Sequence, residues 1–237
     1  MLKERLRLLP NIFKPADQQI KDISDLLASF GLEGQKHVNQ VQNLNEATDE
    51  ILKIIRESED NNQSPLGHIF CDFDGVIRPR LVMRNFSLKE KKLTVRALKS
   101  LIKNVHSFTL WSSRIVVNTD NHQGIAAFLT NHLIEGNNAL SRFPFFTNRS
   151  LRRLFNYLQD INPNCDIEFN IGPEKLTGQD PFIEKALNIL NQGQSLFIIS
   201  SSFVDRMRIK KLVELCQQNN SNLLNHLYYF DTGRMIY

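Results

Sequence analysis

The chain has few cysteines and no long apolar run, and each shortage narrows the class of protein to which it can belong. Its three cysteines (Cys71, Cys165 and Cys216) are scattered among 237 residues, with neither the spacing of a disulfide framework nor that of a zinc site. We therefore expect a reducing, cytoplasmic environment. No stretch approaches the ~18 consecutive apolar residues of a membrane-spanning helix, so we expect no membrane span.

The overall composition is typical of a folded domain. Hydrophobic residues make up 41% of the chain and charged residues 23%, a balance that excludes an intrinsically disordered protein. The length suits one large α/β core, or a core with a small appendage. The net charge of +4 favours a phosphorylated or otherwise anionic partner and is compatible with nucleic acid, although a solvated basic surface has the same charge balance.

The first quarter of the sequence predicts helices. Residues 1–13 lack the long apolar core and the small-residue cleavage site of a signal peptide, and we expect a short helix that packs on the core rather than one that binds a partner or a membrane surface. Apolar residues recur at helical spacing over 15–60, with a glycine-containing break, which predicts a helical hairpin. The polar tract 57–64 is typical of a linker. The predicted division is a helical region at 1–64 and a core domain at 65–237.

Strand-like and helix-like segments alternate from residue 68 onward. Short apolar runs predict strands at 68–72, 106–111, 142–146, 166–170, 195–200 and 226–230. Amphipathic stretches between them predict helices at 88–104, 122–134, 149–159, 180–192 and 204–218. This alternation is typical of a mainly parallel sheet with helices on both faces. We therefore predict the α/β class, as a Rossmann-like three-layer sandwich preceded by the helical hairpin.

Two aspartates one residue apart follow the first predicted strand. If residues 68–72 form a buried strand, alternation places Asp72 and Asp74 on the same side as the chain leaves the sheet, and Gly75 permits a sharp turn there. An acid pair at the carboxyl end of a parallel strand can hold a hard divalent cation, or supply a nucleophile and its acid/base partner. A solvated turn rich in Asp and Gly has the same local sequence.

Other polar groups follow later strands. Ser112 ends the second predicted strand, where its hydroxyl could bind a phosphoryl oxygen or cap a helix. Lys175 precedes the helix predicted at 180–192 and is either a counter-charge for phosphate or a solvated surface lysine. The strand predicted at 195–200 runs into three serines, with Asp205 in the following turn, where an acid also commonly caps a helix.

The order of these groups resembles the haloacid dehalogenase-like (HAD-like) phosphohydrolase superfamily over about residues 68–206. A strand with Asp-x-Asp-Gly is followed by a strand that ends in Ser-Ser, then by a lysine, and then by a strand that ends in serines with an aspartate beyond. The resemblance implies that Asp72 is the nucleophile and that Asp74 is the general acid/base. It also implies that Ser112 and Lys175 act on the phosphoryl group.

The implied activity is that of a Mg²⁺-dependent phosphohydrolase that cleaves a phosphomonoester through an aspartyl phosphate, with Asp72, Asp74 and Asp205 at the metal. One position departs from the pattern of the family. Ser201 stands where the family has an acid that is usually a direct metal ligand. Loss of a charged ligand should weaken Mg²⁺ binding. Lys185 is an alternative to Lys175, although it would fall in mid-helix.

The function classes that stay open follow from these features. The alternative to the enzyme is a catalytically weak or inactive HAD-like module that binds phosphate or a partner. A nuclease that uses the acids as ligands of two metals needs more acids than the sequence places near this edge. The expected substrate is a phosphorylated small molecule or a nucleic-acid end, and the edge is either open, with a basic rim, or covered by the N-terminal hairpin as a lid.

Overall fold

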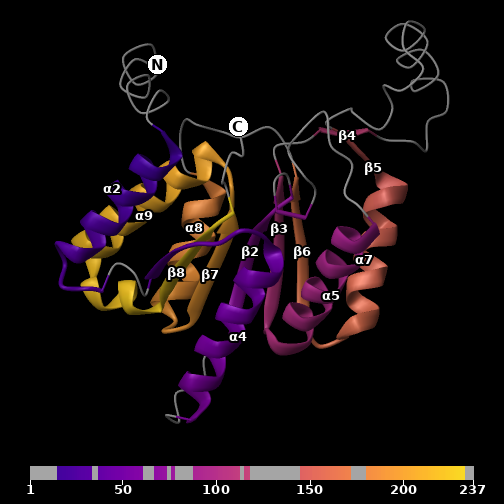
Figure 1. The fold of residues 1–237 in the computed structure, drawn as a ribbon, viewed down its shortest axis with the longest axis horizontal. Helices are drawn as coiled ribbons and strands as arrows, with labels where there is room; N and C mark the ends of the chain where they lie inside the picture. Colours follow the sequence, from indigo (N-terminus) through magenta and orange to yellow (C-terminus); the bar gives the residue numbers. More distant parts are fainter. Residues whose placement is uncertain are drawn as a thin grey trace, which may run out of the picture.

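The protein is built around a six-stranded sheet (Figure 1). The computed structural model describes residues 15–33, 37–60, 67–73, 76–77, 88–112, 115–117, 145–171 and 180–232. In spatial order the strands are β1 (Val38–Gln40), β8 (Leu227–Asp231), β7 (Ser195–Ser200), β2 (Gly67–Asp72), β3 (Ser107–Ser112) and β6 (Asp166–Ile171). Every neighbouring pair in this sheet is parallel, as the alternation of strands and helices predicts.

Helices cover both faces of this sheet. One face lies against α4 (Leu44–Asp60), α5 (Leu88–Asn104) and α7 (Asn148–Ile161). The other face lies against α2 (Ala16–Ala28), α8 (Pro181–Asn191), α9 (Phe203–Asn219) and the 3₁₀ helix η1 (Ser221–His226). The central strands are apolar runs because both of their faces are buried, and their side chains alternate between two hydrophobic clusters. The predicted α/β class with a parallel sheet between two helical layers is confirmed.

The order of the strands defines a switch point next to β2. From β2 the chain builds β3 and β6 on one side, and it then returns to build β7 and β8 on the other side. The helix that follows β2 packs on one face of the sheet, whereas the helix that follows β7 packs on the other. In doubly wound sheets of this kind, ligands bind outside the carboxyl ends of the strands that flank the switch point, which here are β2 and β7.

Two helices on the second face begin with side-chain caps. Asp180 accepts a hydrogen bond from the Phe182 N–H at 3.0 Å, and Pro181 occupies the first position of α8, where a missing N–H is tolerated. Ser202 accepts a hydrogen bond from the Val204 N–H at 3.2 Å at the start of α9. The cap of α9 comes directly after β7, so it fixes the first turn of this helix beside the carboxyl end of that strand.

The prediction of a helical hairpin for residues 15–60 is wrong in one respect. The segment contains the helices α2 and α4, but between them Val38–Gln40 form β1, which pairs with β8 at the edge of the sheet. The spacing of Val38, Val41 and Leu44 fits a helix, so the local sequence predicts one. A strand forms because it pairs with β8, which lies near the end of the chain and gives no local signal. α2 packs on α9 and α4 packs on α5, so this segment completes both helical layers instead of covering the carboxyl edge as a lid.

The remaining elements lie close to their predicted positions where the structure describes them. The predicted helices at 88–104, 149–159, 180–192 and 204–218 are α5, α7, α8 and α9. Part of the strand predicted at 142–146 is β5 (Phe145–Thr147), which pairs with β4 (Ile115–Val117) in a separate two-stranded sheet. The helices predicted for 1–13 and 122–134 lie outside the described residues.

The three cysteines are free and buried. Burial raises the pKa of Cys165 and of Cys216 to about 11, so both thiols stay protonated near neutral pH and act as small apolar groups of the core. Within the described ranges, no helix combines the length and the apolar character that crossing a membrane requires.

His68 is buried at the amino edge of the sheet. Its Nδ1 lies 2.6 Å from Ser107 Oγ, and its ring meets that of His106 edge-on, with 5.4 Å between the ring centres. Burial and the charge of His106 lower the pKa of His68 from 6.5 to about 4. His68 is therefore neutral in the folded protein at pH 5 and above.

We expect the free energy of unfolding to decrease as the pH falls from 6.5 towards 4. The unfolded chain binds a proton at His68 near pH 6.5, and the folded protein does so only near pH 4, so acid favours unfolding by up to about 3 kcal/mol. Urea unfolding at several pH values measures this dependence. His68→Asn should flatten it, whereas His226→Asn, at the end of η1, should preserve it. An unchanged dependence in His68→Asn would contradict the assignment.

Candidate functional site

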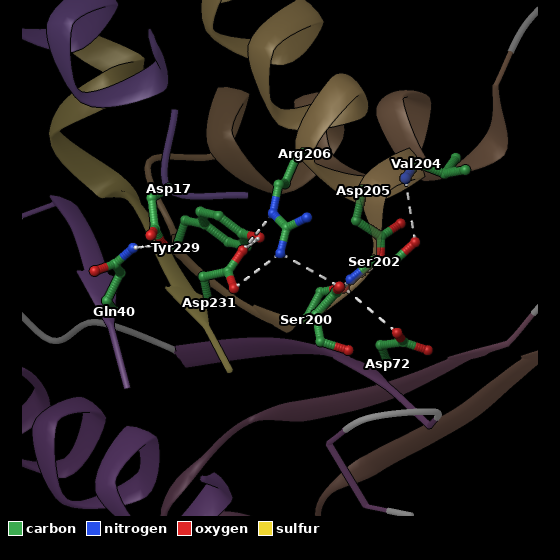
Figure 2. A network of polar contacts seen from close by, with 11 residues as sticks. Asp17, Gln40, Asp72, Ser200, Ser202, Val204, Asp205, Arg206, Tyr229 and Asp231 are labelled. Atoms are coloured by element: carbon green, nitrogen blue, oxygen red, sulfur yellow. Dashed lines mark hydrogen bonds and ion pairs between the residues drawn. The ribbon is translucent and has the colours of Figure 1, made fainter. Parts of the chain in front are cut away.

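Three polar side chains lie at the same level on the carboxyl edge of the sheet. Cys71 pairs with Ile199, so the next residues, Asp72 and Ser200, are neighbours, and Ser200 pairs with Asp231 of β8. By alternation, these three side chains point to the face that α8 and α9 cover. Figure 2 shows them beside the first turn of α9.

Ser200 links two carboxylates. Its hydroxyl donates to Asp205 Oδ2 at 2.6 Å and accepts a hydrogen bond from the Ser202 N–H at 2.9 Å. Its Oγ also lies 3.5 Å from Asp72 Oδ2 (Figure 2). A hydroxyl has one proton and the shorter contact takes it, so the contact with Asp72 is the weaker one. Ser200 and Asp205 are buried and Asp72 is half-buried, which makes Asp72 the acid of this group that a ligand can reach.

Arg208 neutralises the buried Asp205. Its Nη1 donates to Asp205 Oδ1 at 2.9 Å, and its Nε donates to Asp180 Oδ2 at 2.8 Å. Burial by itself would lower the pKa of Arg208, but the hydrogen bond to Asp180 and the charge of Asp205 raise that pKa above its ordinary value. The guanidinium therefore stays charged, and it joins the first turns of α9 to the cap of α8.

A second buried arginine lies at the end of β8. Arg206 holds the Asp231 carboxylate with two hydrogen bonds, from Nε at 2.7 Å and from Nη2 at 3.1 Å. The Tyr229 hydroxyl donates to the same carboxylate, and burial raises the pKa of Tyr229 well above its ordinary value. Arg206 Nη2 also donates to the Ser201 carbonyl at 3.4 Å. This pair therefore anchors the loop between β7 and α9 (Figure 2).

Aromatic rings lie next to Asp72 on the side of β3, opposite Ser200 of β7. Trp111 pairs with Asp72 in register and packs against the Phe70 and Phe182 rings, with ring centres 5.6 Å and 5.1 Å away. The Arg208 guanidinium lies 5.1 Å from the centre of the Phe182 ring. The indole N–H of Trp111 is buried and has no hydrogen-bond partner among the residues that the structure describes. A buried donor without a partner is rare in folded proteins, which makes this N–H a candidate for binding a ligand oxygen.

The structure brings part of the predicted site together. Asp72 and Asp205 both lie at the carboxyl edge, as the sequence predicts. Ser112 ends β3 and is buried, but alternation along the strand directs its side chain to the opposite face from Asp72. Asp74 and Lys175 lie outside the described residues, so their roles stay predictions.

Lys185, the alternative to Lys175, lies away from this edge. It belongs to the middle of α8, where it pairs with Glu168 and its Nζ lies 3.1 Å from Thr109 Oγ1. Thr109 and Glu168 are themselves paired in the middle of β3 and β6. The ammonium group of Lys185 therefore contacts the middle of the sheet, and it is not a candidate for binding a phosphate beside Asp72.

The donors at this edge are of the kind that Mg²⁺ prefers. The carboxylates of Asp72 and Asp205 and the hydroxyl of Ser200 offer oxygen atoms alone. However, Asp205 already accepts hydrogen bonds from Arg208 and Ser200, and no group of three or more His, Cys, Asp or Glu side chains that could hold a metal ion occurs in the described ranges. The described residues therefore supply part of a magnesium site, with Asp72 as its accessible member.

Sequence reasoning missed Asp231 and the two arginines. Asp231 follows an apolar strand just as Asp72 does, and this shared pattern could have signalled it. Arg206 and Arg208 follow Asp205 closely along the chain, but basic residues in the first turns of a helix are usually exposed. Their burial results from the packing of α9 against the sheet and α8, which has no local signal.

Comparison with known proteins gave no match to this chain among family models, curated proteins or solved structures. Fold and site alone therefore define its class. It is an α/β protein with a doubly wound parallel sheet, and the switch point of this sheet carries a half-buried aspartate next to a buried network of serine, aspartate and arginine.

Proposed function

We propose that the protein is a Mg²⁺-dependent phosphohydrolase of the HAD-like type, which cleaves a phosphomonoester through an aspartyl-phosphate intermediate. The observation that carries this proposal is the position of Asp72, a half-buried acid at the carboxyl end of the central strand β2, beside the switch point. The order of the sequence motifs supports the same function. The proposed substrate is a phosphorylated small molecule or a nucleic-acid end, in a cytoplasmic setting.

In the proposed reaction, the Asp72 carboxylate attacks phosphorus in line with the leaving oxygen. The bond between Asp72 and phosphorus forms as the bond to the leaving oxygen breaks, and Asp74 gives its proton to that oxygen. Asp74 then removes a proton from water, which attacks phosphorus and releases phosphate from Asp72. Lys175 is proposed to bind the phosphoryl oxygens, whereas the Ser112 side chain is directed to the opposite face of the sheet. The buried Ser200 contacts Asp72 from β7.

Mg²⁺ would stabilise the negative charge of the phosphoryl oxygens. Asp72, Asp74 and Asp205 are its proposed ligands. Arg208 already supplies a positive charge to Asp205, and Ser201 adds no charge where the family has an acid. We therefore expect this chain to bind Mg²⁺ more weakly than a site with a full set of acids does.

The second candidate function is a module that binds phosphate or a partner without turnover. One observation favours it: each oxygen of Asp205 accepts a hydrogen bond, one from Arg208 and one from Ser200. A cation would have to compete with these donors, which makes Asp205 a poorer ligand than a solvated carboxylate. Such a module would hold a phosphate oxygen through the buried indole N–H of Trp111.

Phosphate release and tryptophan fluorescence together separate the two functions. Trp111 is the one tryptophan of the chain and is paired with Asp72, so its fluorescence reports binding at this edge. An enzyme should release phosphate from 4-nitrophenyl phosphate at millimolar Mg²⁺, and its fluorescence should change with Mg²⁺ and beryllium fluoride, an analogue of the aspartyl phosphate. A binding module should respond to inorganic phosphate without releasing product. Absence of both responses would contradict both functions.

A further inference from the structure

Positive charge is concentrated on two helices of the first face. α5 carries five lysines and one arginine against one glutamate, and α7 carries three arginines against one aspartate. The two helices together have a net charge of +7, whereas the whole chain has a net charge of +4. The remaining residues therefore have a net charge of −3. The two helices pack side by side (Figure 1). These two helices therefore carry more net positive charge than the chain as a whole.

The basic residues of α5 form one stripe along the helix. Lys92, Arg96, Lys99 and Lys103 are all exposed, and their spacing of three or four residues places them on the same side. Neighbouring positions of such a stripe are about 5–6 Å apart. Arg152 of α7 is exposed as well. Within the described part of the chain, none of these five side chains pairs with an acid, unlike the buried arginines of α9.

Exposed apolar side chains gather on the same two helices. Among the described residues, the large hydrophobic side chains that are exposed are Leu93 and Val95 of α5 and Phe155 and Tyr157 of α7. Lys99 Nζ lies 5.8 Å from the centre of the Tyr157 ring, so a cation and a ring share this surface, whereas the Phe155 ring packs against Phe169 of β6. An exposed aromatic ring beside unpaired cations is suited to a ligand that has both negative charges and flat apolar groups.

The apolar side of α5 is already occupied. Its buried residues Ala97, Leu98, Leu101 and Ile102 belong to the core. An amphipathic helix binds a lipid bilayer by inserting its apolar side, so α5 has no such side to offer a membrane. Single-stranded nucleic acid fits the exposed side better, because its phosphates match the stripe of cations and its unpaired bases stack on aromatic rings.

We propose that the outer surface of α5 and α7 binds single-stranded nucleic acid. The stripe on α5 contacts backbone phosphates, which requires no particular base sequence. Tyr157, which lies beside Lys99 of the stripe, stacks against a base, and stacking of this kind requires bases that are not paired. A duplex therefore binds through its phosphates alone and more weakly than a single strand does. The surface does not depend on chemistry at Asp72.

The stripe on α5 runs towards the edge of the sheet at which Asp72 lies. β2 and β3 are parallel neighbours, so α5 returns the chain from the carboxyl edge, where Asp72 lies, to the amino edge. A strand that lies along the stripe therefore reaches the carboxyl edge with one end. This last step rests on the proposed function: if Asp72 is a phosphohydrolase nucleophile, the substrate class is the phosphorylated end of a single-stranded nucleic acid.

Fluorescence anisotropy with a labelled oligothymidylate tests the surface. We expect binding that weakens with salt, with a slope of log affinity against log salt of about −0.7 for each phosphate neutralised. The double variant Arg96→Gln/Lys99→Gln should weaken binding roughly tenfold at low salt and reduce that slope by about 1.4. The control Lys210→Gln/Lys211→Gln removes two exposed lysines of α9, on the opposite face of the sheet, and should change neither value.

Two more variants separate stacking from charge and binding from chemistry. Tyr157→Ala should lower the affinity without changing the salt slope, because it removes a ring and no charge. Asp72→Asn should bind oligothymidylate as the wild type does, because the surface does not include Asp72. Binding is therefore still expected if the proposed phosphohydrolase activity is wrong, and the two proposals can fail separately. Equal weakening by the α5 and α9 double variants would overturn the proposal. Binding to phosphatidylserine vesicles but not to oligothymidylate would also overturn it, in favour of a membrane.

Discussion

Replacing Asp72 with asparagine is expected to reduce Mg²⁺-dependent phosphate release roughly a thousandfold or more. The amide has nearly the same shape as the carboxylate but is a far weaker nucleophile, so the aspartyl phosphate does not form. The loss should therefore appear in kcat, with a smaller effect on KM. Steady-state hydrolysis of 4-nitrophenyl phosphate at saturating Mg²⁺ measures both constants.

A matched control removes a negative charge elsewhere. Asp49 is exposed on α4, so Asp49→Asn changes the net charge equally and should keep the wild-type rate. Asp72→Asn relieves the repulsion between the Asp72 and Asp205 carboxylates that Ser200 joins, so its melting temperature should not fall. Retention of more than a tenth of the wild-type rate in folded Asp72→Asn would refute the nucleophile assignment.

Replacing Arg206 with methionine is expected to lower the free energy of unfolding by about 3 kcal/mol or more. The Asp231 carboxylate is 2% exposed and is held by two hydrogen bonds from Arg206. Methionine fills much of the same volume but leaves a buried charge without its cation. The loss should also release the Ser201 carbonyl and loosen the loop between β7 and α9. Urea unfolding measures the change in stability.

Two comparisons identify the buried charge as the cause. Lys185→Met breaks a partly exposed pair with Glu168 and should cost less than about 1 kcal/mol. Arg206→Met/Asp231→Leu removes both buried charges and should recover part of the loss, because an apolar pair of similar volume can replace a buried ion pair. If the loss of stability in Arg206→Met/Asp231→Leu equalled the sum of the losses in Arg206→Met and in Asp231→Leu, the explanation would be wrong.

The elements nearest the site were predictable because their patterns are short and strong. The apolar run from Ser195 to Ser200 ends in serines and forms β7 with the predicted bounds. α5 likewise has the predicted bounds, Leu88–Asn104. A buried strand must be apolar on both sides, and the first polar residue after it marks its carboxyl end. The position of Asp72 at such an end follows from the same rule.

The contacts of the site were less predictable than its positions. The resemblance implies that Asp205 is a metal ligand, and the structure gives it Arg208 and Ser200 as partners. Lys185 is in mid-helix, as expected, and the structure adds its pairing with Glu168. Each of these partners depends on how a helix is rotated against the sheet, and a rotation of this kind is set by many apolar contacts at once.

Local patterns were thus enough to establish the parallel α/β class, the order of the polar groups and the position of Asp72, because each depends on residues close together in the chain. The pairing of β1 with β8 and the burial of Arg206 and Arg208 arose only when distant segments packed together. The physical reason is the range of the interactions: strand and helix periodicity act over a few residues, whereas burial and charge pairing depend on surfaces that meet only in the folded protein.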